Sequence, residues 1–376
     1  MSIELIDLTK KYGDVTAVDN LSLTFPDKEL AVLIGPSGCG KTTALRLINR
    51  LLEATSGDIT FDGTSIREIP QIELRRSIGY VIQEIGLFPH MTVFQNIAVV
   101  PRLLQWDDNR ITSRVKELLD LVNLEPSDYM EKYPAQLSGG QRQRVGVARG
   151  LGADPKILLM DEPFGAIDPI NRETLQDSFL EIQREIQKTI VFVTHDIREA
   201  VKLGDRIAIL RTGQLVQYDE VMQIINHPAN SFVEDLMGSD RALKGLELLR
   251  VEDSYDPDYF ALSLAEVKNV GDASRRVADS GQAFAFVIDE SGRLQGYVHQ
   301  HDLEEKDGST LLVEVIKPAE SVQTVSTLME AITRMVTTGI TSAAVVDKKQ
   351  RILGVMRFRD VFPRVEELAG DPEQRR

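Results

Sequence analysis

The chain has 376 residues and a mass of 42.0 kDa, which is too long for one ordinary domain and predicts two or three. Its formal net charge is −15, divided as −10 in residues 1–240 and −5 in residues 241–376, so the acidity is spread along the chain. This acidity, with a pI near 4.9, excludes nucleic acid as the main partner, because binding a phosphate backbone requires a basic surface.

The sequence indicates a cytoplasmic protein. Its single cysteine excludes a disulfide framework and suits a reducing compartment. The amino terminus, MSIELIDLTKKYGD, lacks the basic and then apolar order of a secretory signal. No apolar run approaches the roughly 18 to 20 residues that span a bilayer. We therefore expect any work at a membrane to be done through a partner.

The first part of the chain alternates strand patterns with helix patterns. Two strand-like segments, MSIELIDL and LSLTFP, precede the apolar run Leu30–Ile34, which leads through a glycine-rich turn into the helical stretch TTALRLINRLL. Residues 107–130 predict an amphipathic helix and a loop. Further strands are predicted at Asp58–Phe61, Gly79–Gln83, Ile157–Met160, Ile190–Thr194 and Arg206–Leu210. Strands separated by helices indicate a mixed α/β core with a helical insertion.

Beyond a Pro/Asn-rich hinge at Asn226–Ser231, residues 277–303 and residues 336–362 follow one pattern. Each segment has a short helix, an apolar strand ending in Asp, a charged turn, a strand opening with Gly and a closing Asp. We therefore predict an internal repeat. The predicted domains are residues 1–236, a first repeat at 237–305, a second at 306–366 and a solvated tail at 367–376.

The run from Gly35 to Thr42 (GPSGCGKT) fits the phosphate-loop pattern G-x-x-x-x-G-K-[ST] and lies between a buried strand and a helix, as that pattern requires. Glycines allow backbone N–H groups to surround a phosphate, and the helix amino end adds partial positive charge. Lys41 is expected to reach the β- and γ-phosphates, and the Thr42 hydroxyl to bind Mg²⁺. The ATP-binding residues predicted here are Gly35, Pro36, Ser37, Gly38, Cys39, Gly40, Lys41, Thr42 and Thr43.

A second apolar strand, Ile157–Met160, ends in the carboxylates Asp161 and Glu162. Adjacent residues of a strand point to opposite sides, so the two carboxylates are expected to have separate roles. In phosphoryl transfer the protein mainly positions groups and neutralises charge. Asp161 would bind Mg²⁺, and Glu162 would polarise the attacking water. A solvated strand end would explain the carboxylates alone, but not their occurrence together with a phosphate loop.

The segment Leu137–Gln141 (LSGGQ) lies twenty residues before Asp161 and resembles the signature sequence of ABC-type ATPases. The other motifs of that family follow in order over residues 1 to about 236. The resemblance implies a P-loop α/β domain with a helical subdomain, which hydrolyses ATP with Mg²⁺. It also implies that Tyr12 stacks on adenine and that His195 contacts the γ-phosphate.

The same resemblance assigns two further residues. Gln83 matches the glutamine that senses Mg²⁺ and the coupling helices, and Asp168 ends a D-loop that has GAID in place of the commoner SALD. The implied catalytic residues are Glu162, His195 and Gln83, and the implied Mg²⁺ ligands are Thr42, Gln83 and Asp161.

In that family, ATP lies between the phosphate loop of one copy and the signature sequence of another. This chain has one set of motifs, so the resemblance implies a homodimer with two ATP sites at its interface. Ser138, Gly139, Gly140 and Gln141 would then act on the ATP of the other copy, with Asp168 near the interface. ATP binding would close the dimer and hydrolysis would reopen it, which can drive a membrane partner.

The segment Gly79–Ala98, followed by VPRLLQW, looks like the ATPase subunits of importers for osmoprotectants, which carry glycine betaine, carnitine, choline or proline. This implies permease subunits as partners at the cytoplasmic face of the membrane and, indirectly, an extracytoplasmic solute-binding protein or domain. Two alternatives stay open: an importer of another solute, such as an amino acid, and a soluble ATP-driven regulatory protein.

The paired repeats resemble a tandem CBS module, an α+β pair that regulates transport in this subfamily, with a degenerate first copy. Such pairs often bind an adenine nucleotide through a Ser or Thr and an Asp three residues later. Asp302 and Asp360 are therefore candidate ligand residues. The residues three positions before them, however, are His299 and Arg357 and not Ser or Thr. This departure leaves cyclic di-AMP and a response to ionic strength as alternatives.

Overall fold

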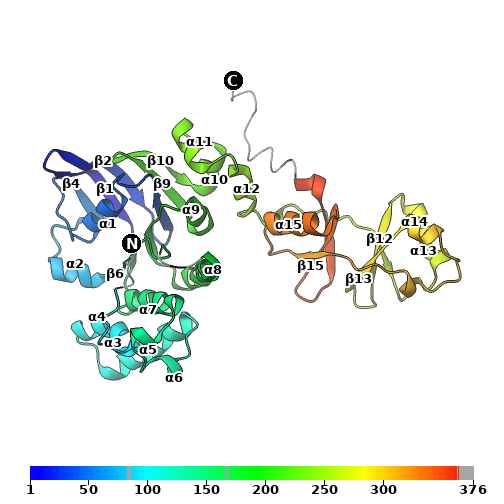
Figure 1. Cartoon of the computed structure of the whole chain (residues 1–376), viewed down its shortest axis with the longest axis horizontal. Helices are drawn as coiled ribbons and strands as arrows, with labels where there is room; N and C mark the ends of the chain where they lie inside the picture. Colours follow the sequence, from blue (N-terminus) through cyan, green and yellow to red (C-terminus); the bar gives the residue numbers. More distant parts are fainter. Residues whose placement is uncertain (83–85, 166, 168, 362, 364–376) are drawn as a thin grey trace. The chain divides into compact units, whose positions relative to one another are not determined.

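The computed structural model describes residues 1–82, 86–165, 167, 169–361 and 363 (Figure 1). The chain divides into two compact units, Met1–Gly238 and Ser239–Arg376. Over the described ranges, the helices are either too short or too polar to cross a membrane.

The larger sheet of the first unit has six strands, of which only β10 is antiparallel to its neighbour. Three of the parallel strands are buried along their whole length, which explains their largely apolar sequences, because helices cover both faces of such a sheet. In order across the sheet, the strands are β10 (Gln214–Glu220), β9 (Arg206–Arg211), β3 (Leu30–Ile34), β8 (Thr189–Val193), β7 (Ile157–Asp161) and β6 (Ile78–Val81).

The smaller sheet of this unit is antiparallel. Its strands are, in order, β2 (Val15–Phe25), β1 (Ile3–Tyr12), β4 (Ser56–Phe61) and β5 (Thr64–Ser65). The predicted strand LSLTFP thus extends back to Val15. Beside this sheet lies α1 (Lys41–Ile48), which ends earlier than TTALRLINRLL predicts, because Arg50 has a left-handed backbone with a φ of 46°.

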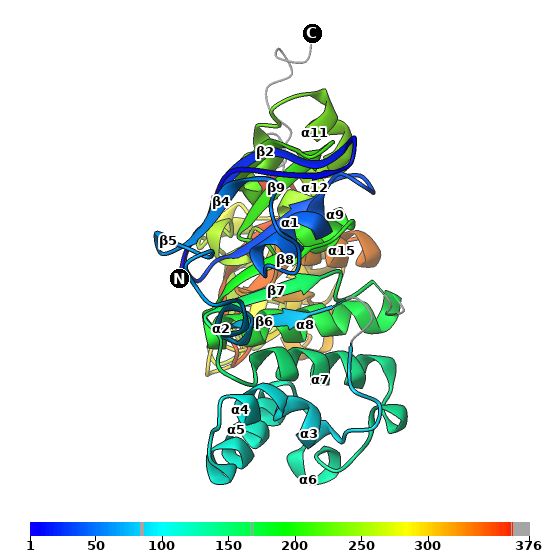
Figure 2. The same cartoon turned by 90° about the vertical axis from the view of Figure 1, so that its left-hand side faces the viewer.

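A group of helices follows β6 and gathers at one end of the large sheet, as Figures 1 and 2 show. The predicted helix in residues 107–130 begins where Asp107 accepts a hydrogen bond from the Arg110 N–H at 2.9 Å. The helices of this group are α3 (Val93–Ile97), α4 (Val99–Leu103), α5 (Asp108–Leu121), α6 (Pro126–Tyr129) and α7 (Gly139–Leu151). Because α7 packs on β6, the predicted mixed α/β core with a helical insertion is confirmed.

The remaining helices of the first unit connect or follow strands of the large sheet. They are α2 (Gln71–Ser77), α8 (Pro169–Ile186), α9 (Ile197–Leu203), α10 (Val221–Asn226) and α11 (Ser231–Met237).

The second unit contains two three-stranded sheets of the same topology, so the predicted internal repeat is present. In each, a parallel strand pair is followed by an antiparallel one, with an irregularity at the same place, Val287/Ile288 and Val345/Val346. After α12 (Arg241–Leu246), the first repeat has β11 (Ala261–Ser263), α13 (Val270–Ser280), β12 (Phe284–Ile288), β13 (Leu294–His299) and α14 (Gln300–Glu304). The second has β14 (Ser321–Gln323), α15 (Leu328–Thr338), β15 (Ser342–Val346) and β16 (Ile352–Arg357).

Alternation along β12 gives its two faces different neighbours. Ala285 and Val287 belong to the core of the first repeat, together with residues of α13. Phe286 points the other way and packs against buried residues of the second repeat, including Ala344 and Val355. The two sheets of this unit therefore share an apolar contact.

Candidate functional site

Three motifs of the first unit, namely the phosphate loop, the paired carboxylates and the segment with His195, meet where the parallel strands of the large sheet end. β3, β8 and β7 are parallel neighbours, and both Leu33 and Asp161 pair with Val193. The phosphate loop follows β3, His195 follows β8, and the paired carboxylates lie at the end of β7. Ligands of parallel α/β sheets bind outside the carboxyl ends of the strands, so the topology places three distant segments around one site.

The phosphate loop requires glycine at two of its positions for steric reasons. Gly35 has a φ of 147°, and a Cβ there would lie 2.1 Å from the carbonyl oxygen of Leu210. Gly40 has a φ of 105°, and a Cβ there would lie 2.3 Å from the carbonyl oxygen of Ala17. The loop is therefore packed closely against neighbouring backbone, and both glycines have a left-handed backbone conformation that other residues rarely adopt.

Lys41 is buried at the start of α1, and its charge is directed into the loop. Its Nζ donates hydrogen bonds to the carbonyl oxygens of Gly35 at 2.8 Å and Pro36 at 3.1 Å. Cys39 is also buried, with its Sγ 3.8 Å from the same Nζ. A phosphate oxygen is a stronger partner for an ammonium group than these neutral carbonyls, so the arrangement suits an incoming phosphate.

Thr42 and Asp161 form the candidate Mg²⁺ site. The Thr42 hydroxyl donates to Asp161 Oδ1 at 2.9 Å. Burial raises the pKa of Asp161 above its ordinary value, although the hydrogen bond from Thr42 and the charge of Arg46 oppose the shift. Both side chains offer oxygen, the donor that Mg²⁺ prefers, and a bound cation would offset the cost of burying the charge of Asp161. The residues therefore fit the ion.

We predict that Asp161→Asn raises the melting temperature of the nucleotide-free first unit at pH 8 by about 2–4 °C. A carboxyl whose pKa is raised by folding stabilises the folded state at low pH, and this stabilisation is lost as the pH rises through the folded pKa. The gain should therefore shrink as the pH falls toward the folded pKa. Thermal melts of the variant in a series of buffers below pH 8 test the prediction, with the exposed Asp120→Asn as control. An unchanged or lowered melting temperature at pH 8 would contradict it.

Strand alternation does not set the direction of Glu162, because β7 ends at Asp161. Its backbone leaves β7 in a left-handed conformation with a φ of 44°, while its N–H donates to the Val193 carbonyl at 2.9 Å. Its Oε2 lies 3.1 Å from His195 Nδ1. The His195 side chain is 63% exposed and that of Glu162 is 19% exposed. In this pair the imidazole is therefore open to solvent, while the carboxylate is mostly buried. Backbone strain of this kind is common at functional sites.

The sequence analysis did not identify the residues that fix the short segment between β8 and α9, which contains His195. The Thr194 hydroxyl donates to Glu199 Oε2 at 2.6 Å, and Gln176 Nε2 donates to Glu199 Oε1 at 3.2 Å. Glu199 is buried, and burial raises its pKa. The only sequence signal was Asp196 followed three residues later by Glu199, a pattern that predicts the start of α9 but not an inward carboxylate.

The LSGGQ segment begins α7 with a reciprocal cap. Ser138 Oγ accepts from the Gln141 N–H at 3.2 Å, and Gln141 Oε1 accepts from the Ser138 N–H at 2.9 Å. Ser138 and Gly139 are exposed, and Gly140 is half-buried beside Leu175. A Cβ at Gly139 would meet no heavy atom within 4 Å, so packing within the described chain does not require glycine there.

Tyr12 ends β1 and is 47% exposed, with Lys10 Nζ 5.1 Å from the centre of its ring. It therefore has a free surface on which a flat ring could stack. Gln83 and Asp168 lie outside the described residues, so their assigned roles stay predictions.

The two candidate ligand residues of the second unit have partners within the protein. Asp302 accepts from Lys317 Nζ at 2.6 Å, which lowers the pKa of the carboxyl. Asp360 accepts from the Arg357 N–H at 3.2 Å. Neither aspartate lines the cleft of about 360 Å³ between the two repeats. Their role in ligand binding stays a prediction.

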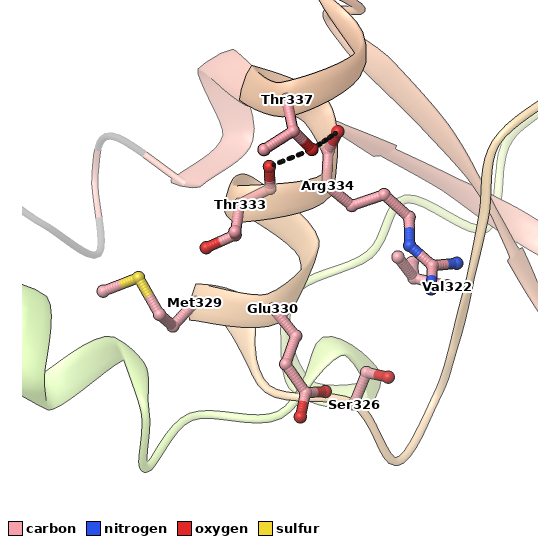
Figure 3. Close-up of a pocket in the computed structure, with 7 residues that line it drawn as sticks. All are labelled: Val322, Ser326, Met329, Glu330, Thr333, Arg334 and Thr337. Carbon is pink, nitrogen blue, oxygen red and sulfur yellow. Dashed lines mark hydrogen bonds between the residues drawn. The ribbon is translucent and has the colours of Figure 1, made fainter. Parts of the chain in front are cut away.

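A second hollow of this unit lies along α15 (Figure 3). Its polar side chains are bonded mainly to backbone of the same unit: Thr337 Oγ1 donates to the carbonyls of Thr333 at 2.8 Å and Arg334 at 3.1 Å, and Arg334 donates to the Ser321 carbonyl. Glu330 Oε2 accepts from the Thr327 N–H at 3.0 Å. These groups stabilise the helix and its start.

Comparison with known proteins gives matches in both units. A model of the ABC transporter family matches residues 18–165, and a model of the CBS domain matches residues 313–367. The osmoprotectant import ATP-binding protein OsmV of Salmonella typhimurium is 44% identical, over 84% of this chain and 83% of its own. The glycine betaine/carnitine/choline transport ATP-binding protein OpuCA of Bacillus subtilis is 41% identical, over 94% of this chain and 93% of its own.

Solved structures resemble the first unit. One is the dimeric post-hydrolysis state of the ATP-binding cassette MJ0796 bound to ADP and Pi, which is 33% identical with a TM-score of 0.52. The match covers 58% of this chain and 98% of the cassette.

Proposed function

The chain belongs to the ABC transporter family as the ATP-binding subunit of an importer, and from this we propose that it powers uptake of a quaternary-amine compatible solute such as glycine betaine, carnitine or choline. The main support is the OpuCA relative, whose name includes all three solutes and whose similarity extends over 94% of this chain. The similarity thus includes the second unit as well as the ATPase.

The chain is an ATPase coupled to transport. In our proposal, the loop N–H groups and Lys41 bind the β- and γ-phosphates, and Tyr12 stacks on adenine. Thr42 and Asp161 hold Mg²⁺, which neutralises phosphate charge when it is bound. Glu162 accepts a proton from the attacking water, and His195, oriented by its contact with Glu162, donates to a γ-phosphate oxygen.

The signature segment is proposed to act on ATP held by a second copy. Its helix α7 has an exposed amino end, and a Cβ at Gly139 would have open space around it, so packing within the described chain does not account for a glycine there. Close approach of a phosphate to the backbone would account for it, because helix amino ends attract anions. The dimeric MJ0796 cassette supports two copies as the working unit.

The other proposed partners follow from the family. Permease subunits would receive the ATP-driven movement, and an extracytoplasmic solute-binding protein would deliver cargo to them. The first unit would then lie at the cytoplasmic face of the membrane through those subunits. The second unit is proposed to regulate transport.

We predict that cells lacking this chain lose osmotically stimulated uptake of at least one of labelled glycine betaine, carnitine and choline. Uptake at low and high osmolarity, with and without the chain, tests this, and expression of the Glu162→Gln chain should fail to restore it. Proline is included as a fourth solute. Unchanged uptake of all four would remove the proposed cargo while leaving the ATPase assignment in place.

A further inference from the structure

The cleft between the two repeats of the second unit has an unusual composition. Its volume of about 360 Å³ falls within the range of small-molecule sites. The rings of two phenylalanines and a tyrosine, one imidazole and one carboxylate line it, together with small and neutral residues from the second repeat. The lining residues used below are Phe284, Phe286, Tyr297, His299 and Glu320.

The aromatic rings come from one face of the first sheet. Phe284 pairs across β12 and β13 with His299, and Phe286 pairs with Tyr297, so all four side chains share a face. The Phe284 ring lies 5.3 Å from Phe286 at an angle of 86°, and 6.4 Å from Tyr297 at 89°. Phe286 is buried in the core, so the half-buried rings of Phe284 and Tyr297, which stand at right angles, form the two walls that can face a ligand. Such walls attract quaternary ammonium groups, because each ring face is partly negative.

The charge of the cleft also favours a cation. Glu320, half-buried before β14, accepts a hydrogen bond from the Ala344 N–H through its backbone carbonyl at 2.9 Å, and among the described residues its carboxylate has no hydrogen bond or ion pair. No Lys or Arg is among the described residues that line the cleft. A polyphosphate ligand would meet the Glu320 carboxylate with the imidazole of His299 as the one basic group among the described lining residues, whereas a cation would be stabilised by both the carboxylate and the rings.

We propose that this cleft binds a quaternary ammonium cation, so that the second unit senses the class of solute that the importer delivers. Trimethylammonium groups keep their charge at every pH and cannot donate hydrogen bonds, which suits aromatic walls better than a hydrogen-bonding site. The link to the transported solute rests on the proposed function, but the cleft chemistry does not. Binding would give the cell a readout of solute already accumulated.

The test is equilibrium dialysis of labelled choline against the purified full chain without ATP. We expect saturable binding that tetramethylammonium displaces. The neutral isostere 3,3-dimethylbutan-1-ol should compete at least about tenfold less well, because it has the shape of choline without the charge. Glu320→Gln and Phe284→Leu should each weaken choline binding about tenfold. Glu290→Gln, an exposed carboxylate in a turn of the same unit, should leave binding unchanged.

Several outcomes would overturn the proposal. These are no choline binding, equal competition by the neutral isostere, or choline binding that neither cleft variant alters. Cyclic di-AMP or ATP binding that depends on Phe284 and Glu320, without choline binding, would assign the cleft to a nucleotide. Thermal melts of both variants confirm that they fold.

The two proposals fail separately. Choline uptake that requires the chain, without choline binding in dialysis, would reject the cleft proposal and keep the transport function. Choline binding at the cleft together with unchanged uptake of all four solutes would keep the cleft proposal and reject the proposed cargo.

Discussion

Glu162→Gln is expected to lower the ATP turnover rate by about 10³-fold while ATP binding is retained. Glutamine has the same size as glutamate and can still contact His195, whose Nδ1 lies 3.1 Å from the carboxylate. It cannot accept a proton from water at neutral pH, so the attacking water would lose its base. Phosphate release and binding of a fluorescent ATP analogue measure the two effects separately.

The control for this variant is Glu73→Gln, the same chemical change at an exposed position of α2. It should leave both turnover and ATP binding at the level of the unmodified chain. Undiminished hydrolysis by Glu162→Gln would show that another group activates the water. Loss of ATP binding would mean that Glu162 holds the structure of the site.

Ser138→Arg, added to the Glu162→Gln chain, is expected to weaken the ATP-induced dimer at least about 100-fold. The slow variant should accumulate as an ATP-bound dimer if the signature segment of one copy closes on the ATP of the other. Ser138 is exposed at the amino end of α7, where its hydroxyl caps the helix. Arginine would remove that cap and fill the space that the γ-phosphate needs. Sedimentation with ATP and Mg²⁺ measures the monomer–dimer equilibrium.

Binding of ATP to the monomer should survive this change, because the phosphate loop of the same copy is untouched. Ser113→Arg, on an exposed face of α5, serves as the matched control and should leave the dimer intact. If Ser138→Arg dimerises with ATP as readily as the control, the signature segment does not lie at the interface.

Local features of the first unit could be predicted because short stretches determine them. Strands such as Leu30–Ile34 are apolar throughout, which is the pattern of a parallel strand covered on both faces. The glycines of the phosphate loop indicated a turn that other residues cannot form, and the structure places Gly35 and Gly40 against neighbouring backbone. The repeat in the second unit was visible for a similar reason, since each copy follows one order of helix, strand and turn.

The elements, the motifs and the family resemblance could therefore be predicted from the amino-acid sequence, since they depend on residue types at short spacing. Which side chains meet follows from how the chain packs in three dimensions. The left-handed backbone of Glu162, the inward carboxylate of Glu199 and the place of Glu320 in the cleft all depend on contacts between segments that are separate in the sequence. The apolar strand Phe284–Ile288 indicated burial, but alternation alone could not say which face would meet the core and which a cleft. That choice is made by the packing of one repeat on the other.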